Sequence, residues 1–522
     1  MAKASQMIIE KDQPFSTSLF WQGQRQFYHE KGIEAWASEV PFYITSNPFI
    51  AHRYAEIVLR FIQDWIKQHP GAEKDPFYIV ELGAGSGQFS FYMLKSLTEL
   101  LQNFSLQDIR LNYIMTDFTE NNIRFWQQHQ QLIPYVESQL LDFARFDLEK
   151  DQTIVTTERK TTLTTGSCKN PMVVVANYLF DSVISDIFSV KNKKIQQSLV
   201  SLSTTSNNVT KGQVKNWQRV SIKHQEKPID AQHYLDPTLN TIVHEYASTL
   251  GDGYLLFPIG CLQGLNNLKK LCHDQMLLIS SDKGHSTLGE LKDRDFPQLD
   301  FHGSFSLMVN YHAVTRYFQL KNGDAFLQSP RDGLTTAVFS SGFKLDEMHE
   351  TRYLLTESVE GFSPSDFFNY YELVESGAKF MRLNALASTL CVSRWDPFVF
   401  EIIAERLAEL FPKGSTEVIE YICNNLRKIA DNFYYVPGCD DVFFSIGYLL
   451  YSIDRFDLAV EYYCQSKQMF PANFELLYNL ALCYFYQKKY KKSMATLNEA
   501  LVLDPKNKDV KTLLRAIKAK IK

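Results

Sequence analysis

The sequence lacks the cysteine pairs, long apolar runs and basic excess that mark several common protein classes. None of its eight cysteines forms a Cys-x-x-Cys pair, so neither a zinc knuckle nor a redox dithiol is indicated, and a reduced interior is expected. No segment approaches the ~20 apolar residues needed to span a bilayer, and the N-terminus carries no secretory signal. The net charge of -5 argues against a nucleic-acid partner, which usually requires a basic face. These absences predict a cytoplasmic protein with no membrane span.

Metal-ligand spacing is also missing among the histidines in the first part of the chain, His29, His52, His69 and His129. No metal site is predicted. At about 150 residues per domain, the 522 residues suggest two to four folded units.

The N-terminal part, residues 1–75, has a helical pattern. Within it, residues 50–68 place five large apolar side chains on one helical face, namely Ile50, Tyr54, Val58, Phe61 and Trp65. Pro70 and Gly71 are expected to end this helix.

From residue 77 short apolar strands alternate with helical segments. The strands are FYIVELG at 77–83, LNYIMTDF at 111–118, MVVVANYLF at 172–180 and QMLLISSD at 275–282. This alternation is typical of an α/β fold in which helices cover both faces of a parallel sheet. A Rossmann-like core is therefore predicted over residues 76–360.

The core pattern is interrupted by a polar stretch at residues 192–240. Its alternating pieces, SLVSLS and QVKNWQRVSI, predict an inserted antiparallel hairpin. Beyond about residue 360 the strand signals end, so residues 361–436 are expected to form a helical connecting region.

Residues 437–522 repeat with a period of 34. Pro437, Pro471 and Pro505 share this spacing, as do the small residues Gly447 and Ala481. Small residues let two helices approach closely, and each proline closes a second helix. The pattern resembles the tetratricopeptide repeat, with two good units and a weaker one ending at Pro437; an unrelated helical pair is the alternative. The resemblance implies an all-α surface that binds a protein or peptide.

The stretch YIVELGAGSGQF is a strand that ends in a glycine-rich loop. Closely spaced glycines let the backbone approach a ligand, and the following helix, FSFYMLKSLTELLQNF, starts there. Leu94, Leu97, Leu101 and Phe104 are expected on its buried face. A dinucleotide fingerprint requires glycine where Gln88 stands. The next acid at a strand end is Asp117. A purely structural glycine turn is the alternative.

This arrangement resembles the class I S-adenosylmethionine-dependent methyltransferases, whose first loop reads acid-x-Gly-x-Gly-x-Gly and whose second strand ends in an acid. The resemblance implies S-adenosylmethionine as the cofactor. Glu81 would orient the loop and the methionine end, Asp117 would hold the ribose, and Asp147 would face the adenine amino group. A sulfonium cation with hydroxyl and amine donors is suited by carboxylates. The remaining implied cofactor residues are Gly83, Ala84, Gly85, Gly87 and Asn177.

The stretch Asn177-Tyr-Leu-Phe-Asp181-Ser looks like the Asn-Glu-Leu-Phe-Asp-Ala signature of the MidA family, which comprises mitochondrial complex I assembly methyltransferases and their bacterial relatives. The segments LLISSDKGH and GSFSLMVNYHAVTRYF resemble further family segments, and the resemblance spans about residues 40–390. The family methylates protein, with arginine as the known target class. Asn177, Tyr178 and Asp181 are thereby implied as catalytic residues, although Tyr178 and Lys283 stand where the family has glutamate and tyrosine.

The sequence therefore predicts a methyltransferase that acts on a protein side-chain nitrogen, with Asp181 orienting the acceptor for in-line transfer. Two alternatives stay open. Tyr178 and Lys283 would suit an adaptor whose methyltransferase-like domain no longer transfers methyl groups, whereas the intact glycine loop and Asp117 favour an enzyme. The third possibility is methylation of a small metabolite. Individually, Asn177 and Asp181 could cap local turns and Tyr178 could serve packing.

Overall fold

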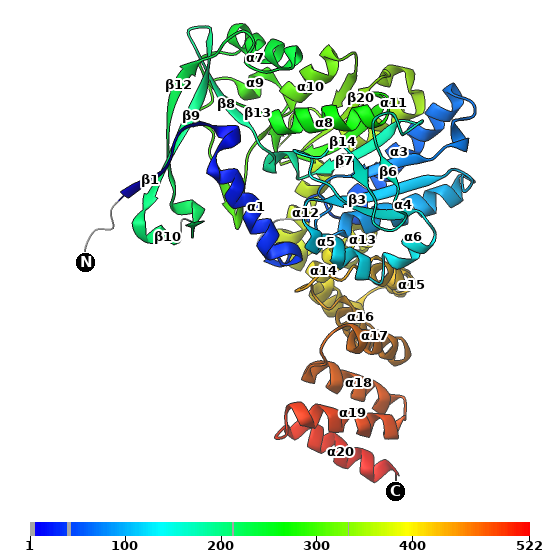
Figure 1. The fold of residues 1–522 in the computed structure, drawn as a ribbon. Coiled ribbons are helices and arrows are strands. Elements are labelled where there is room, and N and C mark those ends of the chain that lie inside the picture. The colour runs from blue at the N-terminus through cyan, green and yellow to red at the C-terminus, as the bar shows by residue number, and fades with distance from the viewer. Residues whose placement is uncertain (1–5, 39–42, 211–212, 332, 522) are drawn as a thin grey trace. The chain divides into compact units, whose positions relative to one another are not determined.

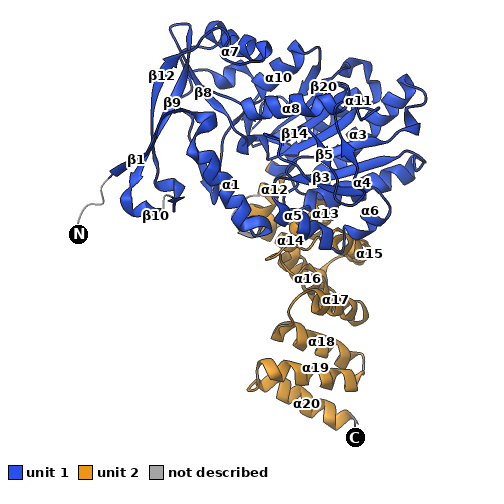
Figure 2. Ribbon diagram, viewed as in Figure 1, with its two compact units in different colours: residues 1–368 blue, residues 369–522 orange. Residues whose placement is uncertain are grey.

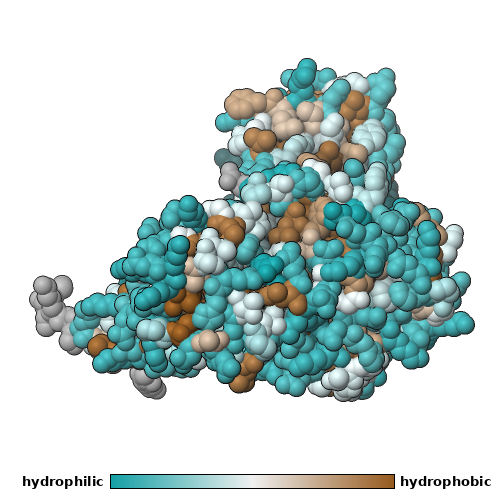
Figure 3. Space-filling view, turned by 90° about the horizontal axis from the view of Figure 1, so that it is seen from above, coloured by the Kyte–Doolittle hydropathy of each residue, from teal (hydrophilic) through white to brown (hydrophobic). Residues whose placement is uncertain are grey.

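The computed structural model describes residues 6–38, 43–210, 213–331 and 333–521. The chain divides into two compact units, Met1–Phe368 and Asn369–Lys522 (Figure 1 and Figure 2). The face shown in Figure 3 is mostly hydrophilic, with hydrophobic side chains gathered in small patches, as is usual for a water-exposed surface. Among the described residues, no helix combines the length and the apolar character that crossing a membrane requires.

The first unit is built on a seven-stranded sheet in the order β19-β20-β14-β7-β2-β3-β4. The four strands expected from the sequence are all present, as β2 Phe77–Glu81, β3 Leu111–Asp117, β7 Met172–Asn177 and β14 Met276–Asp282. These run parallel to one another and to β4, whereas β20 runs antiparallel between β14 and β19. The sequence did not indicate the other three strands, β4 Leu141–Arg145, β19 Asp324–Leu327 and β20 Thr335–Ser341.

The order of the strands reverses beside β2. The chain continues from β2 to β3 on one side and later places β7 on the other side. In open α/β sheets such a switch point leaves a crevice outside the carboxyl ends of the strands. Glu81, Asp117 and Asn177 are the last residues of β2, β3 and β7, so the topology alone brings them to one edge.

Helices cover the sheet because its strands are apolar on both faces. One face packs against α7, α8 and α10 in a single core cluster. Helix α3 packs against α4, and its five predicted apolar residues are all buried. The expectation for α4 was wrong at one end, since the helix stops at Asn103 and Phe104 is 41% exposed. The helices of this unit are α1 Leu19–Lys31, α2 Ala35–Ser38, α3 Pro48–Gln68, α4 Gln88–Asn103, α5 Glu120–Gln128, α6 Ile133–Glu137, α7 Pro237–Thr249, α8 Ile259–Leu271, α9 Leu288–Leu291, α10 Tyr311–Leu320 and α11 His349–Leu355.

A second, antiparallel sheet contains the polar stretch. Its strands are β1 Gln6–Pro14, β8 Asp186–Lys191, β9 Lys194–Thr205, β12 Ser221–Pro228 and β13 Gly253–Phe257. Strands β9 and β12 pair antiparallel from Ser203 opposite Ser221 to Gln196 opposite Pro228, as expected. The piece QVKNWQRVSI, however, is not one strand, because Trp217–Arg219 form a 3-10 turn within it.

The expectation of a wholly helical N-terminus was wrong for Gln6–Pro14. This segment is β1, which pairs antiparallel with β9 along Gln6–Pro14 opposite Thr205–Leu199. Its alternation is short, and the partner that makes it a strand lies far along the chain. Residues 1–5, 39–42, 211–212, 332 and 522 of the predicted segments lie outside the described residues.

The second unit is helical. Its helices are α13 Leu383–Val392, α14 Pro397–Leu410, α15 Thr416–Asn432, α16 Val442–Tyr451, α17 Phe456–Met469, α18 Phe474–Tyr486, α19 Tyr490–Leu503 and α20 Lys508–Ile521, while α12 Pro364–Gly377 crosses the division between the units. The predicted helical pairs are α16 with α17 and α18 with α19. Pro471 and Pro505 each follow two residues after the second helix of a pair, as expected.

The small residue at position 447 is required by close packing. A Cβ atom on Gly447 of α16 would lie 2.7 Å from the ring of the fully buried Tyr463 of α17. We expect Gly447→Ala to lower the free energy of unfolding of the helical unit by about 1–3 kcal/mol, because overpacking displaces the ring. Urea unfolding followed by circular dichroism measures this change.

The control is Gly377→Ala, since no atom lies within 4 Å of a Cβ at that position. This variant should stay within about 0.5 kcal/mol of the wild type. Equal effects of the two substitutions would contradict the close contact between α16 and α17.

Candidate functional site

A cavity of about 230 Å³ lies at the carboxyl edge of the central sheet. Nine of the ten residues singled out in the sequence line it, namely Glu81, Gly83, Ala84, Gly85, Asp117, Asp147, Asn177, Tyr178 and Asp181. Gly87, the tenth, precedes α4 as its N-cap and is not part of the lining. The structure thus brings together residues that span 101 positions of the sequence. Their individual roles stay predictions.

The loop after β2 needs glycine for two physical reasons. Gly83 and Gly85 have φ angles of 63° and 55°, in the left-handed region that favours glycine. A Cβ on Gly85 would also lie 2.7 Å from the indole of Trp36, and one on Gly83 would lie 2.9 Å from Leu179. The close approach therefore involves side chains of the protein itself, and Trp36 lies against the loop.

Glu81 is buried at the start of the loop. Its carboxylate accepts hydrogen bonds from the Ser90 hydroxyl and from the Tyr113 hydroxyl, the latter at 2.6 Å. Burial raises the pKa of Glu81 to about 7, and these two hydrogen bonds oppose the shift. The contacts show that Glu81 fixes the loop to α4 and β3, whatever else it contacts.

Asp117 is held by three donors from the turn that follows β3. Its Oδ1 accepts from the Thr119 backbone N–H at 2.8 Å and from Thr119 Oγ1 at 2.9 Å, and its Oδ2 accepts from Asn122 Nδ2 at 2.9 Å. Burial raises the pKa of this carboxyl group. A carboxylate has about four acceptor positions. The Gly85 backbone N–H also contributes a hydrogen bond to this carboxyl group, so Asp117 links the glycine loop to the turn after β3 and lines the cavity.

Asn177 presents an unsatisfied donor at the cavity. Its Oδ1 accepts from the Tyr54 hydroxyl at 3.0 Å and from the Ser281 backbone N–H at 3.2 Å, which fixes the orientation of the amide. Its Nδ2 is buried and has no hydrogen-bond partner among the described residues. An unpaired buried donor costs about 1–3 kcal/mol. This amide group fits a ligand that brings an acceptor such as a carboxylate.

Asp181 also lines the cavity, from the 3-10 turn Phe180–Ser182 that follows β7, and is 3% exposed. Its Oδ1 accepts from the Ser182 hydroxyl at 2.8 Å, and its backbone N–H donates to Asp282 Oδ2 at 3.1 Å. Burial raises the pKa of Asp181 to about 6, although the charge of Lys283 acts in the opposite direction. Burial and the charge of Asp181 raise the pKa of the fully buried Asp282 well above its usual range. At neutral pH we therefore expect Asp181 to be the ionised member of this pair.

Tyr178 has a backbone conformation that is unusual for an aromatic residue. Its φ is 47°, in the left-handed region, and its backbone N–H donates to the Ser281 carbonyl at 3.0 Å. Such strain is common at functional sites. Burial and the charge of Asp282 raise the pKa of its hydroxyl group, which therefore stays protonated and able to donate at neutral pH.

Further residues of the cavity were not expected from the sequence. Trp21, Arg25 and Tyr28 come from α1 and Trp36 from α2, and the remaining charged or titratable additions are Glu149, Lys283 and His302. Nothing local in the sequence marks the residues of α1. Only Lys283 had a signal, as a departure from the MidA pattern at a strand end. Its Nζ donates to Asp300 Oδ2 and to Ser306 Oγ, both at 3.1 Å.

The charges of the lining suit a cation. Five carboxylates face or border the cavity, against the guanidinium of Arg25 and the ammonium of Lys283, and the five are Glu81, Asp117, Asp147, Glu149 and Asp181. Together with the unpaired amide of Asn177, this donor and acceptor set fits a cationic ligand that also carries a carboxylate.

Comparison with protein families agrees with this chemistry. Residues 57–279 match the model of a family described as "Putative S-adenosyl-L-methionine-dependent methyltransferase". The chain contains an S-adenosylmethionine-dependent methyltransferase domain. The predictions of a class I methyltransferase fold, of this enzyme class and of this cofactor are confirmed. Residues 474–507 match the tetratricopeptide repeat model, which confirms a repeat at α18 and α19. Neither match specifies the acceptor of the methyltransferase.

Several solved structures resemble the methyltransferase at low identity. An uncharacterized protein from Burkholderia thailandensis is 12% identical, with 63% of this chain and 95% of that chain covered and a TM-score of 0.37. A second protein from that organism, bound to S-adenosyl-homocysteine, is 11% identical, with 63% and 87% covered and a TM-score of 0.39. The 1,6-didemethyltoxoflavin-N1-methyltransferase of the same organism is 10% identical, with 65% and 96% covered and a TM-score of 0.28. No curated protein matches the chain. Similarities this low carry no argument about the acceptor.

Proposed function

We propose that the methyltransferase domain acts on a side-chain nitrogen of a protein, with arginine as the first candidate because of the resemblance to the MidA family. The observation that carries the proposal is the buried carboxylate of Asp181 in the same cavity as Asp117 and Asn177. A preorganised carboxylate can orient a nitrogen acceptor and offset positive charge while the methyl group moves. Asp181 has the catalytic role in this proposal, and Tyr178 and Asn177 border the reacting groups.

The cofactor supplies an activated methyl group on its sulfonium when it is bound. In this proposal the carboxylate of Asp117 accepts hydrogen bonds from the ribose hydroxyls, and Asp147 faces the adenine amino group. Glu81 keeps the loop of Gly83, Ala84 and Gly85 in place, with Gly87 at the start of the following helix. The unpaired amide of Asn177 donates to the carboxylate of the methionine part.

The repeats of the second unit support a protein acceptor or partner, because paired helices of this kind provide a surface for peptides. Several further assignments belong to the proposal: membership of the MidA family, a cytoplasmic location and no nucleic-acid partner. The proposal also includes the following domain boundaries: an N-terminal segment at 1–75, a core at 76–360 with its insertion at 192–240, a connecting region at 361–436 and repeats at 437–522.

A second candidate is methylation of a small metabolite, and Lys283 favours it. Lys283 lines the cavity, and its charge lowers the pKa of Asp181 against the effect of burial. An ammonium group at this place repels a guanidinium and suits a neutral or anionic acceptor.

Transfer of a labelled methyl group tests the proposal. The purified full chain is incubated with methyl-labelled S-adenosylmethionine and lysate, after which proteins and small molecules are separated. We expect label in a protein, recovered as methylarginine after acid hydrolysis. Label in the small-molecule fraction would favour the metabolite, and cofactor binding without any transfer would favour the adaptor.

A further inference from the structure

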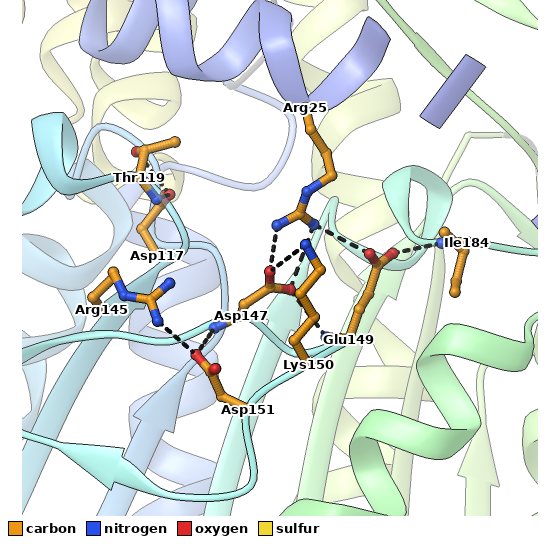
Figure 4. A network of polar contacts seen from close by, with 9 residues as sticks. All are labelled: Arg25, Asp117, Thr119, Arg145, Asp147, Glu149, Lys150, Asp151 and Ile184. Atoms are coloured by element: carbon orange, nitrogen blue, oxygen red, sulfur yellow. Dashed lines mark hydrogen bonds and ion pairs between the residues drawn. The ribbon is translucent and has the colours of Figure 1, made fainter. Parts of the chain in front are cut away.

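The guanidinium of Arg25 lies inside the cavity and pairs with two of its carboxylates. Arg25 comes from α1, and its Nη2 pairs with Asp147 Oδ2, while its Nη1 lies 3.4 Å from Asp147 Oδ1 and 3.1 Å from Glu149 Oε2 (Figure 4). The side chain of Arg25 is 24% exposed and that of Asp147 is 5% exposed. Such partly buried, bidentate ion pairs are stronger and more specific in geometry than surface ion pairs.

An aromatic ring bounds the same guanidinium. Arg25 Cζ lies 4.5 Å from the centroid of the Phe118 ring, and Phe118 directly follows Asp117. Cation–π contact and the carboxylates thus hold the planar group in one place. A flat group with N–H donors at its edge is what this part of the cavity binds.

The two carboxylates have backbone anchors that do not depend on Arg25. The Asp147 backbone N–H donates to Asp151 Oδ2 at 2.8 Å, and the Glu149 backbone N–H donates to Asp147 Oδ1 at 3.2 Å. Glu149 Oε1 also accepts from the Ile184 backbone N–H at 2.9 Å (Figure 4). The acids would therefore keep their places if Arg25 left, and a vacated site would offer an aromatic face beside acceptor oxygens.

We propose that Arg25 limits the affinity for the cofactor by occupying the place of its adenine group. This inference rests on the assignment of Asp147 to adenine in the proposed function. Adenine shares both recognition features of the guanidinium, since it is planar and its amino group donates hydrogen bonds. The adenosine part then binds only when Arg25 has left Asp147. The apparent dissociation constant therefore equals the intrinsic one divided by the fraction of molecules in which Arg25 has left.

Calorimetric titration of the full chain with S-adenosyl-homocysteine and with adenosine tests the proposal. The variant Arg25→Met keeps a long apolar side chain against Phe118 and removes the guanidinium. We expect it to bind both ligands about ten-fold more tightly, because a charge-assisted contact no longer competes. Adenosine is included because it lacks the methionine part. If the variant binds both ligands more tightly, the effect lies at the adenosine part that they share.

The matched control is Arg124→Met on α5, since the side chain of Arg124 is 67% exposed and pairs with the equally exposed Glu120 on the same helix. It should bind as the wild type does. A second variant, Glu149→Gln, removes one of the two carboxylates that pair with Arg25. The amide keeps an oxygen that can accept from the Ile184 N–H. This variant should also tighten binding, and it replaces Arg25→Met if that variant does not fold.

Added salt gives an independent readout. Salt screens the partly exposed ion pair, so the affinity of the wild type should rise with ionic strength. That of Arg25→Met should rise less, because only the longer pair between Lys150 and Asp147 remains. Unchanged or weaker binding by the two variants, with binding by the wild type, would overturn the role of Arg25 and leave the cofactor site standing. Absence of binding to every folded variant and to the wild type would overturn both.

Discussion

Exchange of Asp117 for asparagine is expected to weaken the binding of S-adenosyl-homocysteine by about ten- to one hundred-fold. Hydrogen bonds to a charged group contribute about 1.5–3 kcal/mol, and about 1.4 kcal/mol corresponds to a factor of ten. Asparagine keeps an oxygen for the donors of Thr119, so the turn after β3 should persist. Calorimetry at pH 8 measures the change, because burial raises the pKa of Asp117 and the wild-type carboxyl must be ionised.

The matched control for this variant is Thr119→Val. It removes one donor to Asp117 and keeps both the backbone N–H and the carboxylate. We expect its affinity to stay within about three-fold of the wild type, because the lost contact is internal to the turn. If Asp117→Asn binds normally, the ribose assignment fails. If Thr119→Val loses as much as Asp117→Asn, the carboxylate acts by shaping the turn instead.

The part of the site that could be predicted follows from strand ends. Apolar runs mark β2, β3, β7 and β14, and in a parallel sheet the residues that end them meet at one edge. Glu81, Asp117 and Asn177 were therefore placed by sequence order alone. The glycine spacing was equally informative, because Gly83 and Gly85 adopt positive φ angles that few other residues tolerate.

The unpredicted part depends on contacts between distant segments. Arg25 meets Asp147 across 122 residues, and α1 has no local feature that tells a cavity-facing residue from a surface one. The strand β1 could not be predicted for the same reason, since its partner β9 lies about 190 residues away. Phe104 shows a different limit. Its spacing fits the apolar face of α4, but the helix ends one residue earlier and the ring is exposed.

Exchange of Asp181 for asparagine should lower the rate of methyl transfer by about one hundred-fold and leave the affinity for S-adenosyl-homocysteine within about three-fold. The amide cannot offset positive charge on the acceptor, and misplacement of a reacting group by about 1 Å has effects of this size. The rate is measured on the labelled acceptor at saturating cofactor. Asp186→Asn is the control, because Asp186 is also buried but lies outside the cavity lining. Its rate per folded molecule should match that of the wild type.

The pH dependence separates a catalytic carboxylate from a structural one. Burial raises the pKa of Asp181 to about 6, so the group is protonated below that pH and ionised above it. The wild-type rate should rise as the pH passes through about 6, and Asp181→Asn should lack this rise. The effect of rising pH on the free energy of unfolding has the opposite sign. A carboxyl group whose pKa is higher in the folded state than its ordinary ~3.9 stabilises the fold only while protonated, so stability falls as the pH rises from about 4 to 6. A purely structural Asp181 would change unfolding over this range and leave the pH profile of the rate unchanged, which would exclude it as the acceptor-orienting group.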